Sequence, residues 1–291
     1  MTQQPPRETD IVVITVAYAS ADVLPPFLSS VAKASVRELC VVVADNNPED
    51  GSVAQIVTTT PFQHLGMTKN LGYGSAVNAA VASLGPNVSW LVIANPDVLI
   101  SPGAVDRLIE RAEADPRIAL VGPQIVDESG TIYPSARALP SLRNGIGHAL
   151  LVNLWPANPW SRAYRNQDLS PSAPRTTGWL SGSFFLARRS AFDQVGGFDE
   201  HYFMYFEDVD LGMRLGKAGW LSFYEPSARV THSGAHSTST NASAMTREHH
   251  DSARKFLRTK YSRWYLWPIR VLISLGLAMR FAVLRVRTGV K

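Results

Sequence analysis

Three apolar runs limit the folds open to this chain more than any other feature of its sequence. They read IVVITVA at residues 11–17, ELCVVVA at 38–44 and WLVIA at 90–94. Runs of this kind, rich in β-branched residues, are typical of strands that are buried on both faces. A helical pattern with two prolines near its start lies at residues 23–34, between the first two runs. The order strand, helix, strand predicts an open α/β sheet.

The rest of the chain extends this pattern over a length that suits one large α/β domain, with or without an appendage. A tract rich in Pro, Asn, Arg and Trp interrupts it and is interpreted as a long insertion that shapes a substrate site. The predicted elements are a helix at 104–114, strands at 118–125 and 184–187, short strands at 220–224 and 228–231, and the insertion at 133–173.

Composition excludes several classes of protein. A net charge of +4 among 291 residues is too weak to argue for a nucleic-acid partner, so none is expected. Cys40 is the only cysteine, which excludes an internal disulfide framework and suits a reduced, cytosolic setting. The first ten residues are polar and lack an apolar core, so we expect no secretory signal.

Polar residues follow two of the predicted buried strands. Asp45 comes directly after 38–44, and Asn95-Pro96-Asp97 follows 90–94. In open α/β sheets, ligands bind beyond the carboxyl ends of the strands, where these side chains are expected. Pro96 cannot continue a central strand, so the chain turns there and presents Asp97. A cap on the following turn explains Asp45 equally well.

Two glycines open the helix that follows. Residues 70–78 read NLGYGSAVN, and glycines at this place allow the backbone to approach a ligand closely. The helix N-terminus also offers N–H groups to an anion. A tight turn without a ligand accounts for the same pattern.

A cluster of acidic residues lies within an aromatic run at residues 196–236. Carboxylates held against apolar walls have shifted pKa values, which is how general bases are made. The alternative is an ordinary helix N-terminus, where the helix dipole favours acidic residues. The acidic residues are Asp199, Glu200, Glu207, Asp208 and Asp210, and their neighbours include Phe198, Tyr202, Phe203, Met204, Tyr205 and Phe206.

The C-terminal region is basic and predicted to be helical from residue 246. The apolar stretch between Arg270 and Arg280 is too short to span a bilayer. Arginines gather on one arc of the helical wheel, with Trp and aliphatic residues around them, which resembles an interfacial helix on anionic lipid. Docking on the domain or on a partner chain is the alternative. The arginines are Arg263, Arg270, Arg280, Arg285 and Arg287.

Taken in order, these motifs resemble the inverting family 2 glycosyltransferases of the GT-A fold, over residues 10–240. The resemblance implies a donor-nucleotide half at 10–100, an acceptor and catalytic half at 118–240 and a membrane-associating helical appendage at 246–291. Within the family, the closest resemblance is to actinobacterial enzymes that add rhamnose to decaprenyl-diphosphate-linked N-acetylglucosamine. It is carried by YPSAR at 133–137, NPW at 158–160, GWLSGS at 178–183, FMY at 203–205 and HS at 236–237.

The resemblance implies a donor site with a divalent metal, Mg²⁺ or Mn²⁺, on the diphosphate. Asp97 matches the last acidic residue of the family's Asp-x-Asp motif, while Asn95 replaces the first and removes one carboxylate contact. His232 matches the metal-site histidine, with His236 as its rival. Asp45 matches the acceptor for a pyrimidine N3–H, which cannot tell dTDP from UDP. Two further positions, Asn70 and Gly72, line the donor pocket in the family.

The resemblance also implies a catalytic and acceptor site. Asp208 matches the second residue of the Glu-Asp motif and is predicted to be the general base, with Glu207 as the alternative. Trp179, Ser181 and Gly182 are expected against the acceptor sugar, although core packing explains Trp179 equally well. Three arginines, Arg137, Arg143 and Arg175, could meet the acceptor's diphosphate or be solvated.

The function expected from this resemblance is transfer of L-rhamnose from dTDP-L-rhamnose to N-acetylglucosaminyl-diphospho-polyprenol. The enzyme would be peripheral on the cytoplasmic face of the plasma membrane, and a homo-oligomer is compatible with the sequence. A UDP-sugar donor in cell-wall or exopolysaccharide assembly is the first alternative. The second is a catalytically inactive scaffold that binds sugar nucleotide or lipid, although binding alone needs no general base.

Overall fold

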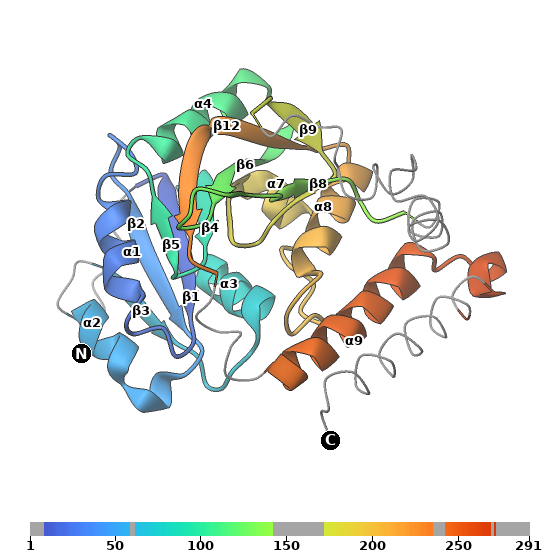
Figure 1. Ribbon diagram of the computed structural model, residues 1–291, viewed down its shortest axis with the longest axis horizontal. Coiled ribbons are helices and arrows are strands. Elements are labelled where there is room, and N and C mark those ends of the chain that lie inside the picture. The colour runs from blue at the N-terminus through green and yellow to red at the C-terminus, as the bar shows by residue number, and fades with distance from the viewer. Residues whose placement is uncertain (1–8, 59–61, 142–171, 235–241, 269–270, 272–291) are drawn as a thin grey trace.

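A single mixed sheet forms the centre of the molecule, as the computed structural model shows for residues 9–58, 62–141, 172–234, 242–268 and 271 (Figure 1). The strand order is β3-β2-β1-β4-β11-β6-β12-β5, with β7 beside β6 and β9 beside β12. A separate pair, β8 and β10, lies off this sheet. The strands are β1 Ile11–Ala17, β2 Cys40–Asp45, β3 Gln63–Gly66, β4 Trp90–Ala94, β5 Val98–Ile100, β6 Ile118–Val126, β7 Ile132–Tyr133, β8 Ala136–Arg137, β9 Arg175–Thr177, β10 Trp179–Leu180, β11 Phe184–Arg188 and β12 Leu221–His232.

Helices cover both faces of the sheet and bury two separate apolar layers. Side chains of α1, α2 and α4 pack on one face, and those of α3, α7 and α8 pack on the other. A third, smaller cluster joins α8 to α9. The helices are α1 Leu24–Val31, η1 Pro48–Asp50, α2 Ser52–Thr58, α3 Tyr73–Ala82, α4 Ala104–Ala114, α7 Arg189–Gln194, α8 Glu207–Lys217, α9 Ala242–Lys260 and η2 Trp264–Leu266.

The register of the strands decides where the polar side chains gather. β1 pairs in parallel with β2 and β4, and all seven residues of β1 are buried, as its apolar run predicts. The carboxyl ends of these strands therefore share one edge, where Ala17 pairs with Asp45. β11 is antiparallel to β4 and begins opposite its end, with Phe184 paired with Ala94. The turn formed by Gly182 and Ser183, directly before β11, therefore lies at the same edge.

The sequence prediction was wrong about one part of the sheet. Two short strands were expected at 220–224 and 228–231, but residues 221–232 form the continuous strand β12. The expected break survives as a shift of register between Glu225 and Arg229. Pro226 lies inside it and has no N–H to donate to the ladder, so the strand bulges there and continues.

Other boundaries agree with the prediction to within a few residues. The helix expected at 104–114 has those bounds, whereas the helix expected at 23–34 ends earlier, at Val31. The short strands β3, β5 and β7 to β10 were not predicted. Residues 142–171 of the expected insertion lie outside the described residues, as does Arg143.

The C-terminal region is helical over α9, which begins before residue 246 and packs on the domain. Phe256 is fully buried there, so the alternative of a helix docked on the domain describes α9. Within the described ranges, no helix is both long and apolar enough to cross a membrane. Apart from Arg263, the arginines expected on the lipid-facing arc lie outside those ranges.

Candidate functional site

The carboxyl edge of the sheet brings together Asp97 and His232, which are far apart in sequence. β5 and β12 pair antiparallel with His232 opposite Val98, which places His232 beside Asp97. Oδ1 of Asp97 lies 3.1 Å from Nε2 of His232, and Nδ2 of Asn95 lies 3.5 Å from the same nitrogen. Burial raises the pKa of Asp97, but the hydrogen bond and charge of His232 outweigh it and hold that pKa below its ordinary value.

This pair fits one side of a divalent metal site. The described residues contain no group of three or more His, Cys, Asp or Glu side chains placed to hold a metal. Mg²⁺ is commonly held by one or two carboxylates together with substrate phosphates and water, so a larger protein cage is not required. An ionised Asp97 and the imidazole of His232 supply a suitable pair of donors. His236, the predicted rival, lies outside the described residues.

Asp45 is fully buried at the end of β2, and both of its carboxylate oxygens have partners. Oδ1 accepts a hydrogen bond from the backbone N–H of Asn47 at 2.9 Å, which is the turn-capping role considered above. Oδ2 lies 2.9 Å from Nε2 of His64, on the neighbouring strand β3. The adjacent Asn46 is also buried and donates to the carbonyl of Gly72 at 2.9 Å. Asp45 therefore belongs to a polar network that ties β2 to the turn before α3.

The glycine of that turn is required by a close approach of backbone. Gly72 has φ +82°, and a Cβ there would lie 2.2 Å from the carbonyl oxygen of Phe203. The N–H of Tyr73 donates to the same oxygen at 2.9 Å. Asn70 is exposed, and its Oδ1 accepts from the N–H of Gly72 at 3.0 Å. Gly72 thus lets the loop before α8 pack on this turn, and the donor-pocket role predicted for both residues stays a prediction.

Asp208 and Tyr73 both hydrogen-bond to the backbone of Gly182, Asp208 to its N–H and Tyr73 to its carbonyl. Oδ2 of Asp208 accepts from the N–H of Gly182 at 2.9 Å, and the Tyr73 hydroxyl donates to the carbonyl of Gly182 at 2.6 Å. Oδ1 of Asp208 accepts from the N–H of Val209 at 2.8 Å. Burial raises the pKa of Tyr73 well above its ordinary value, and the charges of Glu207, Asp208 and Asp97 raise it further. The Tyr73 hydroxyl is therefore close enough to Glu207, Asp208 and Asp97 for their charges to act on it.

The two carboxylates of the Glu-Asp motif are in different environments. Glu207 is buried, and its Oε2 has no hydrogen-bond partner among the described residues. Burial and repulsion from Asp208 raise the pKa of Glu207 to about 8. Burial also raises the pKa of Asp208, but backbone N–H groups and the charge of Arg137 act in the opposite direction. At neutral pH, Glu207 therefore holds the proton more readily and Asp208 is the better acceptor.

The predicted acceptor residues lie around Gly182, with different exposures. Trp179 is half-buried, its indole N–H donates to the carbonyl of Ala138 at 3.2 Å, and it packs in the cluster that joins α8 to α9. Arg137 lies 5.6 Å from the Trp179 ring centroid, a cation–π contact. Ser181 is buried, and its hydroxyl lies 3.1 Å from that of Ser183. Gly182 is the member of this set that contacts Asp208.

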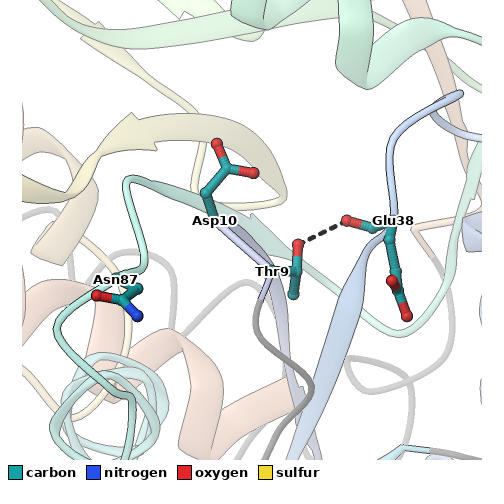
Figure 2. Close-up of a pocket in the computed structure, with 4 residues that line it drawn as sticks. All are labelled: Thr9, Asp10, Glu38 and Asn87. Carbon is teal, nitrogen blue, oxygen red and sulfur yellow. Dashed lines mark hydrogen bonds between the residues drawn. The ribbon is translucent and has the colours of Figure 1, made fainter.

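The pocket drawn in Figure 2 is at the other end of the strands. Its volume is about 360 Å³, and Thr9, Asp10, Glu38 and Asn87 line it. These residues precede β1, β2 and β4, whereas the site residues follow those strands. The pocket is therefore separate from the carboxyl edge.

Sequence reasoning missed three residues of the polar network: Asn46, His64 and Tyr73. Asn46 and Tyr73 lie inside motifs that were singled out, next to the residues that were chosen. Their position beside a strand end and a helix start was the available signal. His64 had no such signal, because β3 is short and was not predicted.

Comparison with known proteins shows the family to which the chain belongs. A model described as glycosyl transferase family 2 matches residues 12–196, and one described as glycosyl transferase family group 2 matches residues 160–287. The N-acetylglucosaminyl-diphospho-decaprenol L-rhamnosyltransferase of Mycobacterium tuberculosis is 47% identical over 283 residues, covering 94% of this chain and 92% of that protein. A rhamnosyltransferase of Escherichia coli is 28% identical, covering 65% of this chain and 71% of that protein.

Solved structures show the same fold at low sequence identity. A mannosyltransferase of Pyrobaculum calidifontis, in complex with GDP-mannose and Mn²⁺, has a TM-score of 0.60 and 14% identity, covering 99% of this chain and 76% of that one. The GalNAc-T7 structure with UDP, GalNAc and Mn²⁺ has a TM-score of 0.53 and 13% identity, covering 76% of this chain and 42% of that one. The predicted GT-A fold is confirmed by these similarities and by the family match.

Proposed function

The chain belongs to glycosyl transferase family 2, and we propose that it transfers L-rhamnose from dTDP-L-rhamnose to N-acetylglucosaminyl-diphospho-decaprenol. The observation that carries the proposal is the 47% identity, over almost the full length of both chains, to the mycobacterial enzyme of that name. The site supports it, because a carboxylate pair and an Asp–His pair are found at the edge of the sheet where nucleotide sugars bind in α/β folds.

Asp208 is the proposed general base. In an inverting transfer, one carboxylate takes the proton from the acceptor hydroxyl as that oxygen attacks the anomeric carbon and the nucleoside diphosphate leaves. Asp208 is less buried than Glu207, and two backbone N–H groups stabilise its ionised form. Burial and repulsion from Asp208 raise the pKa of Glu207 to about 8, so it is mostly protonated at neutral pH and is the weaker candidate for the base. We propose that the carboxyl group of Glu207 stays protonated beside the Asp208 carboxylate.

The Asp97–His232 pair is proposed to hold the donor diphosphate through a divalent metal. When bound, Mg²⁺ or Mn²⁺ would neutralise charge on the leaving diphosphate. Asp97 remains ionised over the whole physiological range, because its pKa lies below the ordinary value. Asn95 lies beside the His232 ring, in place of the carboxylate that many family members have there. At the far end of the donor, Asp45 is the proposed acceptor for the N3–H of the base, because each carboxylate oxygen has a second lone pair beyond its contact with Asn47 or His64.

We further propose that the enzyme works at the cytoplasmic face of the plasma membrane, where a polyprenyl acceptor would lie. Three aromatic residues after α9 are exposed: Trp264 by 81%, Tyr265 by 51% and Trp267 by 58%. The last turn of α9 is basic, with Arg258 and Lys260. Exposed aromatic residues next to basic ones favour the interface of an anionic bilayer. Co-sedimentation with phosphatidylglycerol vesicles tests this, and loss of sedimentation is expected when both tryptophans are replaced by alanine.

A donor panel tests the reaction. The purified protein and a short-chain prenyl-diphosphate-GlcNAc acceptor are incubated with dTDP-rhamnose or with UDP-sugars, in Mg²⁺, Mn²⁺ or EDTA. Metal-dependent product from dTDP-rhamnose alone is expected. Product from a UDP-sugar alone would replace the proposed donor, because Asp45 accepts from uracil and thymine alike. Nucleotide binding without product from any donor would favour an inactive scaffold.

A further inference from the structure

We infer that α9 is a positioning element of the catalytic site, which holds a strained corner of the chain in front of Asp208. The inference deepens the proposed function and rests on it. It gives a positioning role to Ser252 and His249 of α9. Neither residue belongs to the Glu207–Asp208 pair or to the Asp97–His232 pair. The argument starts from the backbone between Met204 and Glu207.

Two consecutive bulky residues at this corner have left-handed backbone conformations. Tyr205 and Phe206 both have φ +67°, and Phe206 is the residue directly before α8. Such conformations are unfavourable for aromatic residues and persist only where the surrounding structure imposes them. Their consequence is local: the chain reverses into α8 so that Glu207 is buried and Asp208 faces the N–H of Gly182.

The corner is held from two sides. On the side of α3, the carbonyl of Phe203 accepts from the N–H of Tyr73, and the turn at Gly72 packs against it. On the other side lies α9, which Figure 1 shows alongside the loop that enters α8. The first contact reaches Phe203, and the rings of the two left-handed residues are contacted from α9.

Contacts from α9 reach each residue of the corner. The Ser252 hydroxyl is fully buried and donates to the carbonyl of Met204 at 2.8 Å. The His249 ring packs edge-on against the rings of Tyr205 and Phe206, with centroids at 5.3 and 5.4 Å. Phe256, also fully buried, packs against Phe206 at 5.6 Å, and Lys255 donates to the carbonyl of His201.

This arrangement explains why α9 contributes a polar hydrogen bond from a buried serine. A purely apolar contact would anchor the helix but leave the peptide plane at Met204 free to turn. The hydrogen bond to that carbonyl sets the plane that begins the left-handed pair. The edge-on contacts with the His249 ring then fix the side chains of Tyr205 and Phe206. The orientation of Asp208 is thereby linked to α9 without contact between α9 and substrate.

Kinetics of Ser252→Ala and His249→Ala test the inference. If the corner relaxes, Asp208 moves from Gly182, and kcat is expected to fall about 10- to 100-fold, since misplacement by about 1 Å has effects of this size. The KM for dTDP-rhamnose should stay within about twofold, because the residues proposed to hold the donor are on other elements. His249→Phe keeps the ring contacts and should restore kcat. Ser83→Ala, which removes a hydroxyl that donates to Ala80 at the end of α3, is the control.

The pH profile separates positioning from a merely structural effect. Loss of the N–H of Gly182 as a donor raises the pKa of Asp208, so the acidic limb of kcat should move to higher pH. The other groups that act on Asp208 are Glu207 and Arg137, which both variants retain. A parallel rise of donor KM, or unchanged kcat and pH profile in both variants, would overturn the inference.

Amide hydrogen exchange keeps the inference testable if the proposed reaction is wrong. In Ser252→Ala, peptides that cover residues 201–212 should exchange about tenfold faster or more, while those that cover 11–45 are unchanged. Uniformly faster exchange, or none at 201–212, would contradict a local role for α9. A wild-type protein that is inactive with every donor would overturn the proposed function alone, and this exchange experiment would still decide the role of α9.

Discussion

The donor edge and the catalytic corner of this enzyme are built in different ways. The donor edge follows from the regular pairing of parallel strands, whose ends carry Asp45 and Asn95. The catalytic corner has two left-handed aromatic residues and a buried carboxylate pair. Regular strand pairing is enough to position a binding residue. A base with a raised pKa must also be buried, and side chains from several elements are needed to bury it.

The two regions differ in how fully their buried polar groups are hydrogen-bonded. At the donor edge, polar groups are satisfied by near neighbours, as Asp45 is by Asn47 and His64. At the corner, Glu207 is buried and its Oε2 has no partner in the part of the chain that the structure describes, and burial of this kind costs free energy. We therefore expect substitutions at the corner to affect turnover, and those at the donor edge to affect donor binding. The predictions below test that contrast.

The largest effect is expected from Asp208→Asn, which removes the proposed base and keeps the shape of the side chain. A fall in kcat of about 10²- to 10⁴-fold is expected, the usual size of a general-base contribution. Binding of the donor nucleotide, measured by calorimetry, should be unchanged. Asp193→Asn, at an exposed carboxylate paired with Arg189, is the matched control. Full turnover by Asp208→Asn would refute the base assignment.

A smaller effect is expected from Tyr73→Phe. The hydroxyl donates to the carbonyl of Gly182 at 2.6 Å, and its loss leaves that carbonyl with one partner fewer next to Asp208. A cost of about 1–2 kcal/mol corresponds to roughly a tenfold lower kcat/KM. Tyr133→Phe, at an exposed tyrosine, should leave the rate unchanged. An equal loss in both variants would show that Tyr73 has no special place in the site.

A change confined to donor affinity is expected from Asp45→Asn. The substitution removes the charge that strengthens a hydrogen bond from the base, worth about 1 kcal/mol, so donor KM should rise roughly fivefold. The value of kcat should be retained, in contrast to Asp208→Asn. Asp50→Asn, in the same loop but exposed, is the control. A fall in kcat without a change in KM would break the separation between the two regions.

The smallest effect on turnover is expected from Glu207→Gln. An amide resembles the protonated carboxyl that Glu207 carries at neutral pH, so kcat should stay within about threefold of wild type, a difference under 1 kcal/mol. A readout of stability is more sensitive. The pKa of Glu207 rises from its ordinary value of 4.5 to about 8 on folding, so the folded state binds more protons and stability falls as pH rises between these values.

Urea denaturation at about pH 5 and about pH 8 measures this effect. Wild-type protein should lose more free energy of unfolding than Glu207→Gln over that interval, because the amide has no proton to release. An identical loss in both proteins would show that Glu207 ionises freely, and Glu207 would then become the stronger candidate for the base.

Much of the donor edge could be predicted from the sequence. The apolar runs at β1, β2 and β4 report burial locally, and the polar residues after the second and third runs mark the edge. Asp45 and Asp97 follow from that logic, and the glycines before α3 mark a close approach. The family motifs added His232, Asp208 and Glu207, which spacing alone does not bring together.

The tertiary structure decided how these residues act. Pairing of β5 with β12 places His232 beside Asp97, and packing from α9 accompanies the left-handed corner before α8. The partner of Gly72 proved to be the backbone of Phe203. Glu207 is buried and Asp208 is only partly buried, although they are adjacent in sequence, and the proposed roles of proton holder and base rest on that difference. Periodicity reports which residues are buried, but pKa values depend on the distances and desolvation that arise when distant segments pack together.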